Sequence, residues 1–128
     1  MHVKEFLLLR YLRDGKEWWD YAKGHIEKGE KSLEAMKREI NEETGLSDIE
    51  VVPGFSSYTK YFFRSEGKNV FKVVDFHLVR SRSKDVRLSK EHAGYAWLPY
   101  EEALARLTHK NAKEMLQKAL EFLLHEVQ

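Results

Sequence analysis

The chain has 128 residues and a mass of 15.2 kDa, a length that predicts one domain covering residues 1–128. Apolar residues make up 42% of the sequence, enough for a hydrophobic core, so wholesale disorder is excluded. The chain has no cysteine, which excludes a disulfide scaffold, a thiolate metal site and a cysteine nucleophile.

Charge and hydropathy argue against two classes of partner. The 22 basic residues are balanced by 21 acidic ones, so we expect neither a nucleic acid nor an anionic membrane as partner. The apolar run at residues 6–9 is one of the longest, and it is far shorter than the roughly 20 residues that a membrane-spanning helix needs. No signal-peptide pattern precedes this run, and we expect a cytoplasmic protein.

The apolar periodicity predicts two strands, a central helix, more strands and two final helices, an order typical of an α/β layered domain with a mixed sheet. The helix begins at an N-cap, Ser32, and stops at Gly45, with Leu33, Met36 and Ile40 along a core-facing stripe. The predicted strands cover residues 4–12, 18–21, 49–52, 55–64, 70–80 and 97–98. The remaining predicted elements are a loop over residues 22–31 and helices over 100–107 and 111–126.

The central helix has its acidic residues in an unfavourable place. Glu39, Glu42 and Glu43 follow one another at helical spacing in the last turn, so like charges repel at the negative end of the helix dipole. A divalent cation such as Mg²⁺, with Mn²⁺ as the alternative, would offset both effects, because hard oxygen ligands suit these ions. The alternative is a solvated helix face, partly neutralised by Lys37 and Arg38.

A longer pattern over residues 24–46 places these carboxylates in a known context. Nine positions occur there at set spacing: Gly24, Glu30, Arg38, Glu39, Ile40, Glu42, Glu43, Gly45 and Leu46. They resemble the signature of the Nudix hydrolase family, G-x₅-E-x₇-R-E-U-x-E-E-x-G-U with U an aliphatic residue. The resemblance implies a Nudix-type α/β/α sandwich with a mixed β-sheet, in which this box forms a loop, a helix and a loop. It also implies a hydrolase of nucleoside diphosphates linked to another group, which works with divalent cations.

Two flanking motifs resemble one branch of the family, the asymmetric diadenosine tetraphosphate hydrolases. Residues 19–25, Trp-Asp-Tyr-Ala-Lys-Gly-His, are similar to its lead-in W-D-F-P-K-G-H. Residues 88–98 are similar to its second motif, L-S-x-E-H-x-x-Y-x-W-L. In that branch the glutamate of the second motif approaches the metal, a role that falls here on Glu91.

The resemblance implies a role for each residue of the box. The expected metal ligands are the carbonyl of Gly24 and the carboxylates of Glu39, Glu42, Glu43 and Glu91. Arg38 is expected to orient these carboxylates, while Glu30 braces the loop and Gly45 ends the helix. The expected catalytic residues are Arg38, Glu42, Glu43 and Glu91, and either Glu42 or Glu91 accepts the proton of the attacking water.

The same resemblance implies six substrate contacts, namely Lys23, His25, Lys72, Phe76, Tyr95 and His109. The lysines and His25 would meet phosphates, Phe76 and Tyr95 would lie near a nucleotide, and His109 stands where the family has an aromatic residue that stacks on adenine. Five of the six have a simpler alternative. Lys23 and His25 then belong to a solvated loop, Phe76 and Tyr95 to packing, and His109 to the exposed start of a helix.

Three departures from the branch stand out. Ala22 replaces a proline, so the turn before the box is less restricted in φ, and His109 replaces Phe or Tyr. Relatives also carry a strand before the one at residues 6–9. We therefore expect either that a partner chain supplies this first strand at an exposed sheet edge, or that the true start lies upstream.

Together these patterns predict a Mg²⁺-dependent hydrolase that splits diadenosine tetraphosphate into ATP and AMP by attack of water on phosphorus. Alternative substrates are ADP-ribose, a nucleoside triphosphate or a 5′-triphosphorylated RNA end. A different alternative is a catalytically silent binding module with the same fold. The expected partner is a nucleotide, and the protein is expected to be a monomer or a homodimer.

Overall fold

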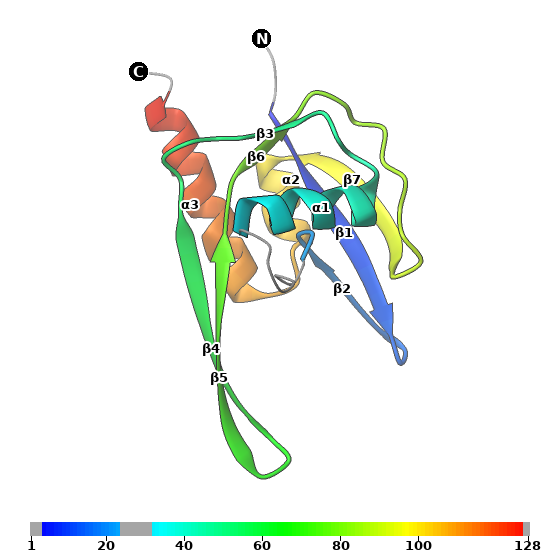
Figure 1. The fold of residues 1–128 in the computed structure, drawn as a ribbon, viewed down its shortest axis with the longest axis vertical. Helices are drawn as coiled ribbons and strands as arrows, with labels where there is room; N and C mark the ends of the chain where they lie inside the picture. The colour runs from blue at the N-terminus through cyan, green and yellow to red at the C-terminus, as the bar shows by residue number, and fades with distance from the viewer. Residues whose placement is uncertain (1–3, 24–31, 127–128) are drawn as a thin grey trace.

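The computed structural model describes residues 4–23 and 32–126, and it confirms the predicted α/β class. At its centre is β1 (Glu5–Arg13), which pairs antiparallel with β2 (Lys16–Asp20) on one side and with β7 (His92–Pro99) on the other (Figure 1). Leu8 and Leu9 of β1 are fully buried, and neighbouring side chains of a strand point to opposite faces. The central sheet is therefore covered on both faces.

Helices pack on both faces of the central sheet. On one face, Leu8 packs against α2 (Tyr100–Arg106) and α3 (Lys110–Glu126), in a cluster completed by Ala103, Leu107, Ala112 and Leu116. Across the other face lies α1 (Ser32–Thr44) (Figure 1). All three helices were predicted within two residues of these bounds. Within the described residues, no helix is both long and apolar enough to cross a membrane.

The remaining strands form two smaller sheets. β3 (Ile49–Val51) pairs with β6 (Val79–Ser81), and β4 (Ser57–Ser65) pairs with β5 (Lys68–Phe76) in a long hairpin that projects from the body (Figure 1). Every strand pair between the described residues is antiparallel, and the strands form three separate sheets, whereas a mixed sheet was expected. The described strands include none of the parallel pairs that a mixed sheet needs.

The strand predicted over residues 70–80 is divided in the structure. β5 ends at Phe76 and β6 begins at Val79, because β5 pairs with β4 whereas β6 pairs with β3. Leu78 lies at the change of partner, and its carbonyl accepts a hydrogen bond from the Val52 N–H at 2.8 Å. No glycine or proline marks this point in the sequence, so periodicity alone predicts one strand.

The end of α1 is set by Thr44 and Gly45. The buried Thr44 hydroxyl donates to the Ile40 carbonyl at 2.6 Å and accepts from the Leu46 N–H at 3.2 Å. Gly45 has a φ of 76°, the left-handed conformation that favours glycine after a helix. The predicted stripe is only partly correct, because Leu33 is an exposed residue while Ala35 and Glu43 are buried. The helix therefore directs a carboxylate inward.

A comparison of Gly45, which follows α1, with Gly67, in the β4–β5 turn, measures how much a side chain at Gly45 would destabilise the fold. Gly45 and Gly67 both have a φ of 76°, but a Cβ at Gly45 would lie 3.1 Å from the Arg87 Cβ, whereas nothing lies within 4 Å at Gly67. We expect Gly67→Ala to lower the free energy of unfolding by about 1 kcal/mol and Gly45→Ala by about 2 kcal/mol or more. Urea denaturation measures both. Equal losses would show that the contact with Arg87 costs nothing.

Candidate active site

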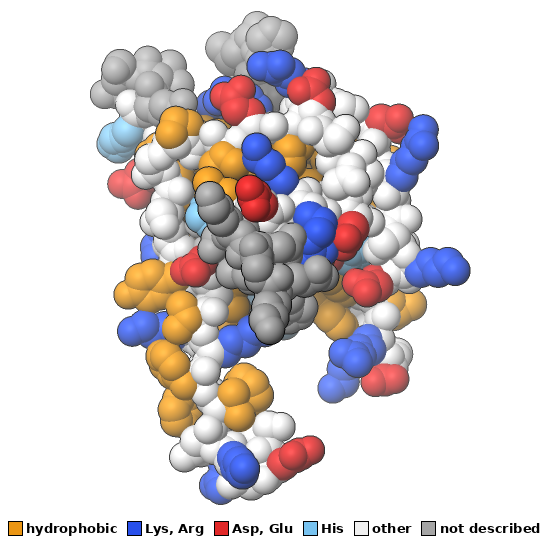
Figure 2. Space-filling model, in the orientation of Figure 1, with side chains coloured by type: hydrophobic (Ala, Val, Ile, Leu, Met, Phe, Trp, Pro, Cys, Tyr) orange, Lys and Arg blue, Asp and Glu red, His pale blue; other side chains and the backbone are white. Residues whose placement is uncertain are grey.

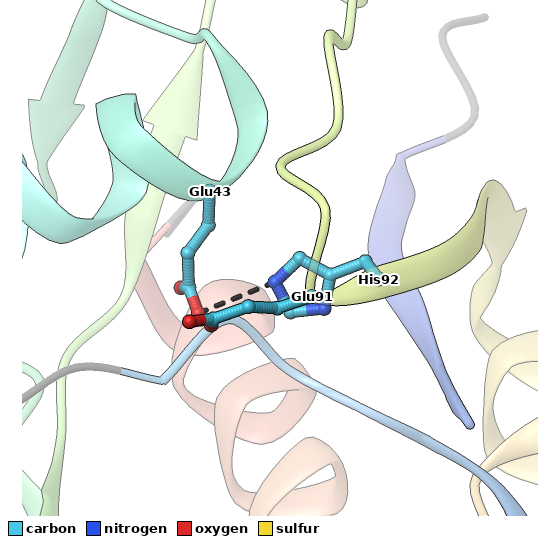
Figure 3. Close-up of side chains that lie close together, drawn as sticks. All are labelled: Glu43, Glu91 and His92. Carbon is cyan, nitrogen blue, oxygen red and sulfur yellow. Dashed lines mark hydrogen bonds and ion pairs between the residues drawn. The ribbon is translucent and has the colours of Figure 1, made fainter. Parts of the chain in front are cut away.

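The C-terminal end of α1 meets the start of β7 at a cluster of three titratable side chains (Figure 3). A carboxylate oxygen of Glu43, one of Glu91 and a ring nitrogen of His92 all lie within 4.8 Å of one another. Glu43 comes from the box, whereas Glu91 and His92 come from the second motif. The two motifs that sequence analysis singled out therefore form one site.

Backbone hydrogen bonds bring the two motifs together. The Arg87 N–H donates to the Thr44 carbonyl at 2.7 Å, and the Ser89 N–H donates to the Glu43 carbonyl at 3.1 Å. The last carbonyls of a helix have no partner within the helix, so these bonds satisfy them. Ser89 then accepts the His92 N–H on its own carbonyl at 3.3 Å, which makes a tight turn. This turn sets Glu91 and His92 beside the end of α1.

Glu43 is held at both carboxylate oxygens. Oε2 accepts the Lys23 backbone N–H at 3.1 Å, and Oε1 lies 3.3 Å from His92 Nε2. The residue is only 6% exposed. Burial, together with the nearby charges of Glu39, Glu91 and Glu42, raises the pKa of Glu43 to about 7, although the Lys23 N–H opposes the shift. Glu43 thus lies in a site with an excess of negative charge.

His92 supports Glu43 from inside the fold. Its side chain is fully buried, and the Tyr11 ring meets it edge to face with centroids 4.7 Å apart. Nδ1 has no hydrogen-bond partner among the described residues. Burial lowers the pKa of His92, so the ring is neutral at neutral pH. The tautomer with its proton on Nε2 fits best, because that proton is donated to Glu43 and no buried N–H is left unpaired.

Arg38 separates the glutamates of the box into two groups. Its guanidinium forms ion pairs with Glu39 at 2.8 Å and with Glu42 at 2.9 Å. These two carboxylates lie outside the cluster of Glu43, Glu91 and His92. Contact with two carboxylates is what an orienting role for Arg38 needs, but that role stays a prediction, as do the metal roles of Glu39 and Glu42.

The cluster is chemically suited to a divalent cation. Two carboxylates from separate elements converge there, and the pKa of the buried one is raised by its burial and then by its negative neighbours. Hard oxygen donors of this kind suit Mg²⁺ or Mn²⁺. The predicted contributions of Gly24, His25 and Glu30 lie outside the described residues.

A pocket of about 380 Å³ lies next to Lys23. Its lining consists of Asp20, Lys23, Tyr61, His109, Lys110 and Asn111. Lys23 and His109 were both predicted substrate contacts, and the structure brings them to the same pocket. The Lys23 ammonium forms an ion pair with Asp20 at 2.9 Å. The pocket thus combines two ring-bearing side chains with two lysines.

The other predicted substrate residues lie around this pocket or away from it. Lys72 stands opposite Tyr61 in the β4–β5 register, so both side chains share the face that carries Tyr61 to the pocket. Phe76 packs edge to face against Tyr21, with ring centroids 6.0 Å apart. Tyr95 lies on β7 opposite Leu9, is exposed, and is not among the residues that line the pocket.

Two side chains of this region are not among the residues predicted from the sequence. His92 is absent from the predicted site residues, although its position directly after Glu91 is a signal for the site. Tyr61 was one aromatic residue among several in a strand, and only its pairing with Lys72 places it at the pocket. Both residues depend on tertiary contacts.

The raised pKa of Glu43 predicts how stability depends on pH without metal. Between about pH 4.5 and 7 the folded protein keeps the Glu43 proton while the unfolded chain has lost it, so the free energy of unfolding falls as pH rises. The full effect is about 3 kcal/mol. Urea denaturation in a chelator should show this fall in the wild type relative to Glu43→Gln. His92, whose pKa is lowered, acts with the opposite sign in both proteins. Parallel pH profiles would contradict the shift.

The contact between His92 and Glu43 predicts the strength of cation binding. His92→Leu removes the donor to Glu43 and should weaken Mg²⁺ or Mn²⁺ binding about 10–100-fold, whereas His92→Gln keeps an N–H donor and should lose much less. Calorimetric titration of each variant measures the affinity, and thermal unfolding checks the fold. His125→Leu, on the exposed end of α3, is the matched control. If His92→Leu binds the cation as tightly as the wild type, His92 has no role in cation binding.

Comparison with known proteins agrees with this geometry. The family model described as NUDIX domain matches residues 2–119. The chain is 38% identical over 121 residues to the asymmetrical bis(5′-nucleosyl)-tetraphosphatase of Mus musculus, with 93% of this chain and 80% of that protein covered. The Caenorhabditis elegans protein of the same name is 29% identical over 120 residues, with 93% and 85% covered.

A solved structure supports the same assignment. The binary complex of C. elegans Ap4A hydrolase superposes with a TM-score of 0.79 at 28% identity, covering 94% of this chain and 87% of that one. These findings confirm the resemblance drawn from residues 24–46 and the two flanking motifs. The chain belongs to the Nudix family, and it is a hydrolase of phosphoric anhydride bonds.

Proposed function

We propose that the protein hydrolyses diadenosine tetraphosphate asymmetrically, giving ATP and AMP. The observation that carries this proposal is the position of the Glu43–Glu91 cluster, which Lys23 links to a pocket with two rings and two lysines. Lys23 contributes its backbone N–H to Glu43 and its side chain to the pocket. The mouse and nematode relatives named after this activity support the same substrate.

The residues of the cluster fit a divalent cation, and we assign it to Glu43 and Glu91. Mg²⁺ bound there would neutralise phosphate charge and lower the pKa of a coordinated water. Glu39 and Glu42, which Arg38 holds on the same helix, are the further predicted ligands. His92 keeps the Glu43 carboxylate in one orientation through its Nε2–H.

In this proposal Glu91 accepts the proton of the attacking water. Glu42 is the other candidate from the sequence, but its carboxylate is engaged by Arg38 at 2.9 Å. Glu91 is exposed to solvent, and its carboxylate lies in the same cluster as the buried Glu43. The carboxylate of Glu91 has two oxygens, so one can bind the cation while the other accepts the proton of a water that lies between Glu91 and the substrate.

The pocket fits one end of a dinucleoside tetraphosphate. Tyr61 and His109 offer ring faces for a base, and Lys23, Lys110 and the nearby Lys72 offer ammonium groups for phosphates. Three ammonium groups suit a long phosphate chain, and the two rings suit the base at one end of it.

A product assay with diadenosine tetraphosphate and Mg²⁺ tests the proposal. We expect ATP and AMP in equal amounts, a loss of turnover in Glu43→Gln, and a 10²–10⁴-fold lower kcat in Glu91→Gln. Glu121→Gln, on an exposed part of α3, is the matched control and should retain the wild-type rate.

Other outcomes of this assay would change the assignment. ADP as the only product would contradict asymmetric cleavage. Metal-dependent cleavage of ADP-ribose, a nucleoside triphosphate or a 5′-triphosphorylated RNA, without cleavage of diadenosine tetraphosphate, would keep the family and reject the substrate.

A further inference from the structure

The β4–β5 hairpin has an outward face that the proposed reaction does not use. Directly opposed residues of an antiparallel pair share one face of the sheet. We define the outer face as the residues Tyr58, Lys60, Phe62, Arg64, Asn69, Phe71, Val73 and Asp75, which form four opposed pairs. Tyr61, one position out of phase with this set, lies on the other face and lines the pocket.

Apolar side chains dominate the middle of the outer face. Phe62 is 69% exposed, Phe71 is 58% exposed and Tyr58 is 54% exposed. Phe62 and Phe71 form a cross-strand edge-to-face pair with centroids 6.4 Å apart. Figure 2 shows the hydrophobic side chains along the projecting hairpin. Exposed apolar clusters of this kind mark interaction sites, because isolated soluble domains rarely keep them in water.

The rest of the described chain leaves this face uncovered. β4 and β5 form a two-stranded sheet with no third strand among residues 4–23 and 32–126. A two-stranded hairpin is at best marginally stable alone, and packing on one of its faces is the usual remedy. The face that carries Tyr61 is turned to the pocket, so the outer face is the one available for a partner.

We propose that the outer face is the interface of a homodimer in which two hairpins pack face to face and antiparallel. The charges of the face favour this arrangement. Arg64 lies near the tip of the hairpin and Asp75 near its base, with the apolar residues between them. Antiparallel packing brings Arg64 of each copy to the Tyr58–Asp75 end of the other. Parallel packing would instead set the two arginines together and the two aspartates together, which is unfavourable.

Lys60 fits the same interface. Its ammonium lies 5.5 Å from the centroid of Tyr58 and 5.9 Å from that of Phe71, so its charge is held over rings within its own face. A single-stranded nucleic acid is the rival occupant, because it stacks on exposed rings between cations. Asp75 and the net charge of only +1 disfavour a polyanion.

The area of the outer face predicts the strength of the dimer. Its four exposed apolar side chains offer about 100 Å² each, or about 800 Å² in total when both copies are counted. Stable interfaces bury roughly 1,200–2,000 Å² and transient ones less. We therefore expect a reversible dimer that forms as the protein concentration rises from micromolar to millimolar.

Sedimentation equilibrium over that concentration range tests the proposal. The wild type should dimerise, Phe62→Ser should weaken the dimer about 30-fold or more, and Leu124→Ser, an equally exposed apolar site on α3, should leave it unchanged. A wild type that stays monomeric throughout the range would overturn the proposal. A dimer that Phe62→Ser does not weaken would also overturn it.

A charge exchange tests the antiparallel arrangement and does not require removal of a ring. Arg64→Asp and Asp75→Arg should each weaken the dimer, and the double variant should restore it. Failure of the double variant to restore the dimer would overturn the antiparallel arrangement. If Phe62→Ser does not fold by circular dichroism, these exposed charge variants decide the outcome. Binding of a labelled single-stranded oligonucleotide by monomeric wild type, lost in Phe62→Ser, would overturn the dimer in favour of nucleic acid.

Discussion

The candidate site depends on the backbone hydrogen bonds that join the end of α1 to the segment before β7. The carbonyls of Thr44 and Glu43 accept the N–H groups of Arg87 and Ser89. Because helix ends leave such carbonyls without partners, the bonds stabilise the end of α1 and place the second motif in the same step. Gly45 permits the approach, since a side chain there would meet Arg87. The Glu43–Glu91–His92 cluster is thus a consequence of how one helix ends.

This arrangement opposes the preferences of an isolated helix. The last turn of α1 has no basic residue and ends in a buried glutamate, where the helix dipole already favours positive charge. Lys23 and His92 supply hydrogen bonds to Glu43, but neither bond brings a formal charge while His92 is neutral. The buried negative charge of Glu43 therefore destabilises the folded protein, and folding alone does not require it. A cation bound at the cluster would offset that destabilisation, so the raised pKa of Glu43 and the family assignment agree with one another.

The local features of this fold were predictable from sequence, and the contacts between distant segments were not. Gly45 marks the end of α1, because a glycine in the left-handed conformation after a helix is a local signal. The apolar periodicity of the sequence does not predict the division between β5 and β6, because this division reflects a change of pairing partner at Leu78. The box predicted the carboxylates as a set, but the separation of Glu43 from the two that Arg38 holds needs the packed helix. His92 and Tyr61 gain their roles from neighbours far along the chain.

The β4–β5 hairpin differs from the body of the protein in how its two faces are used. A strand pair with one face in water normally alternates apolar and polar residues, yet this hairpin carries exposed aromatic residues on both faces. Tyr61 on one face lines the pocket, whereas Phe62 and Phe71 on the other face belong to the proposed dimer interface. The same two strands would then serve both sites, and a two-stranded hairpin deforms easily. If substrate binding strengthens the proposed dimer by a given factor, dimer formation must strengthen substrate binding by the same factor, because coupling between two binding sites is reciprocal.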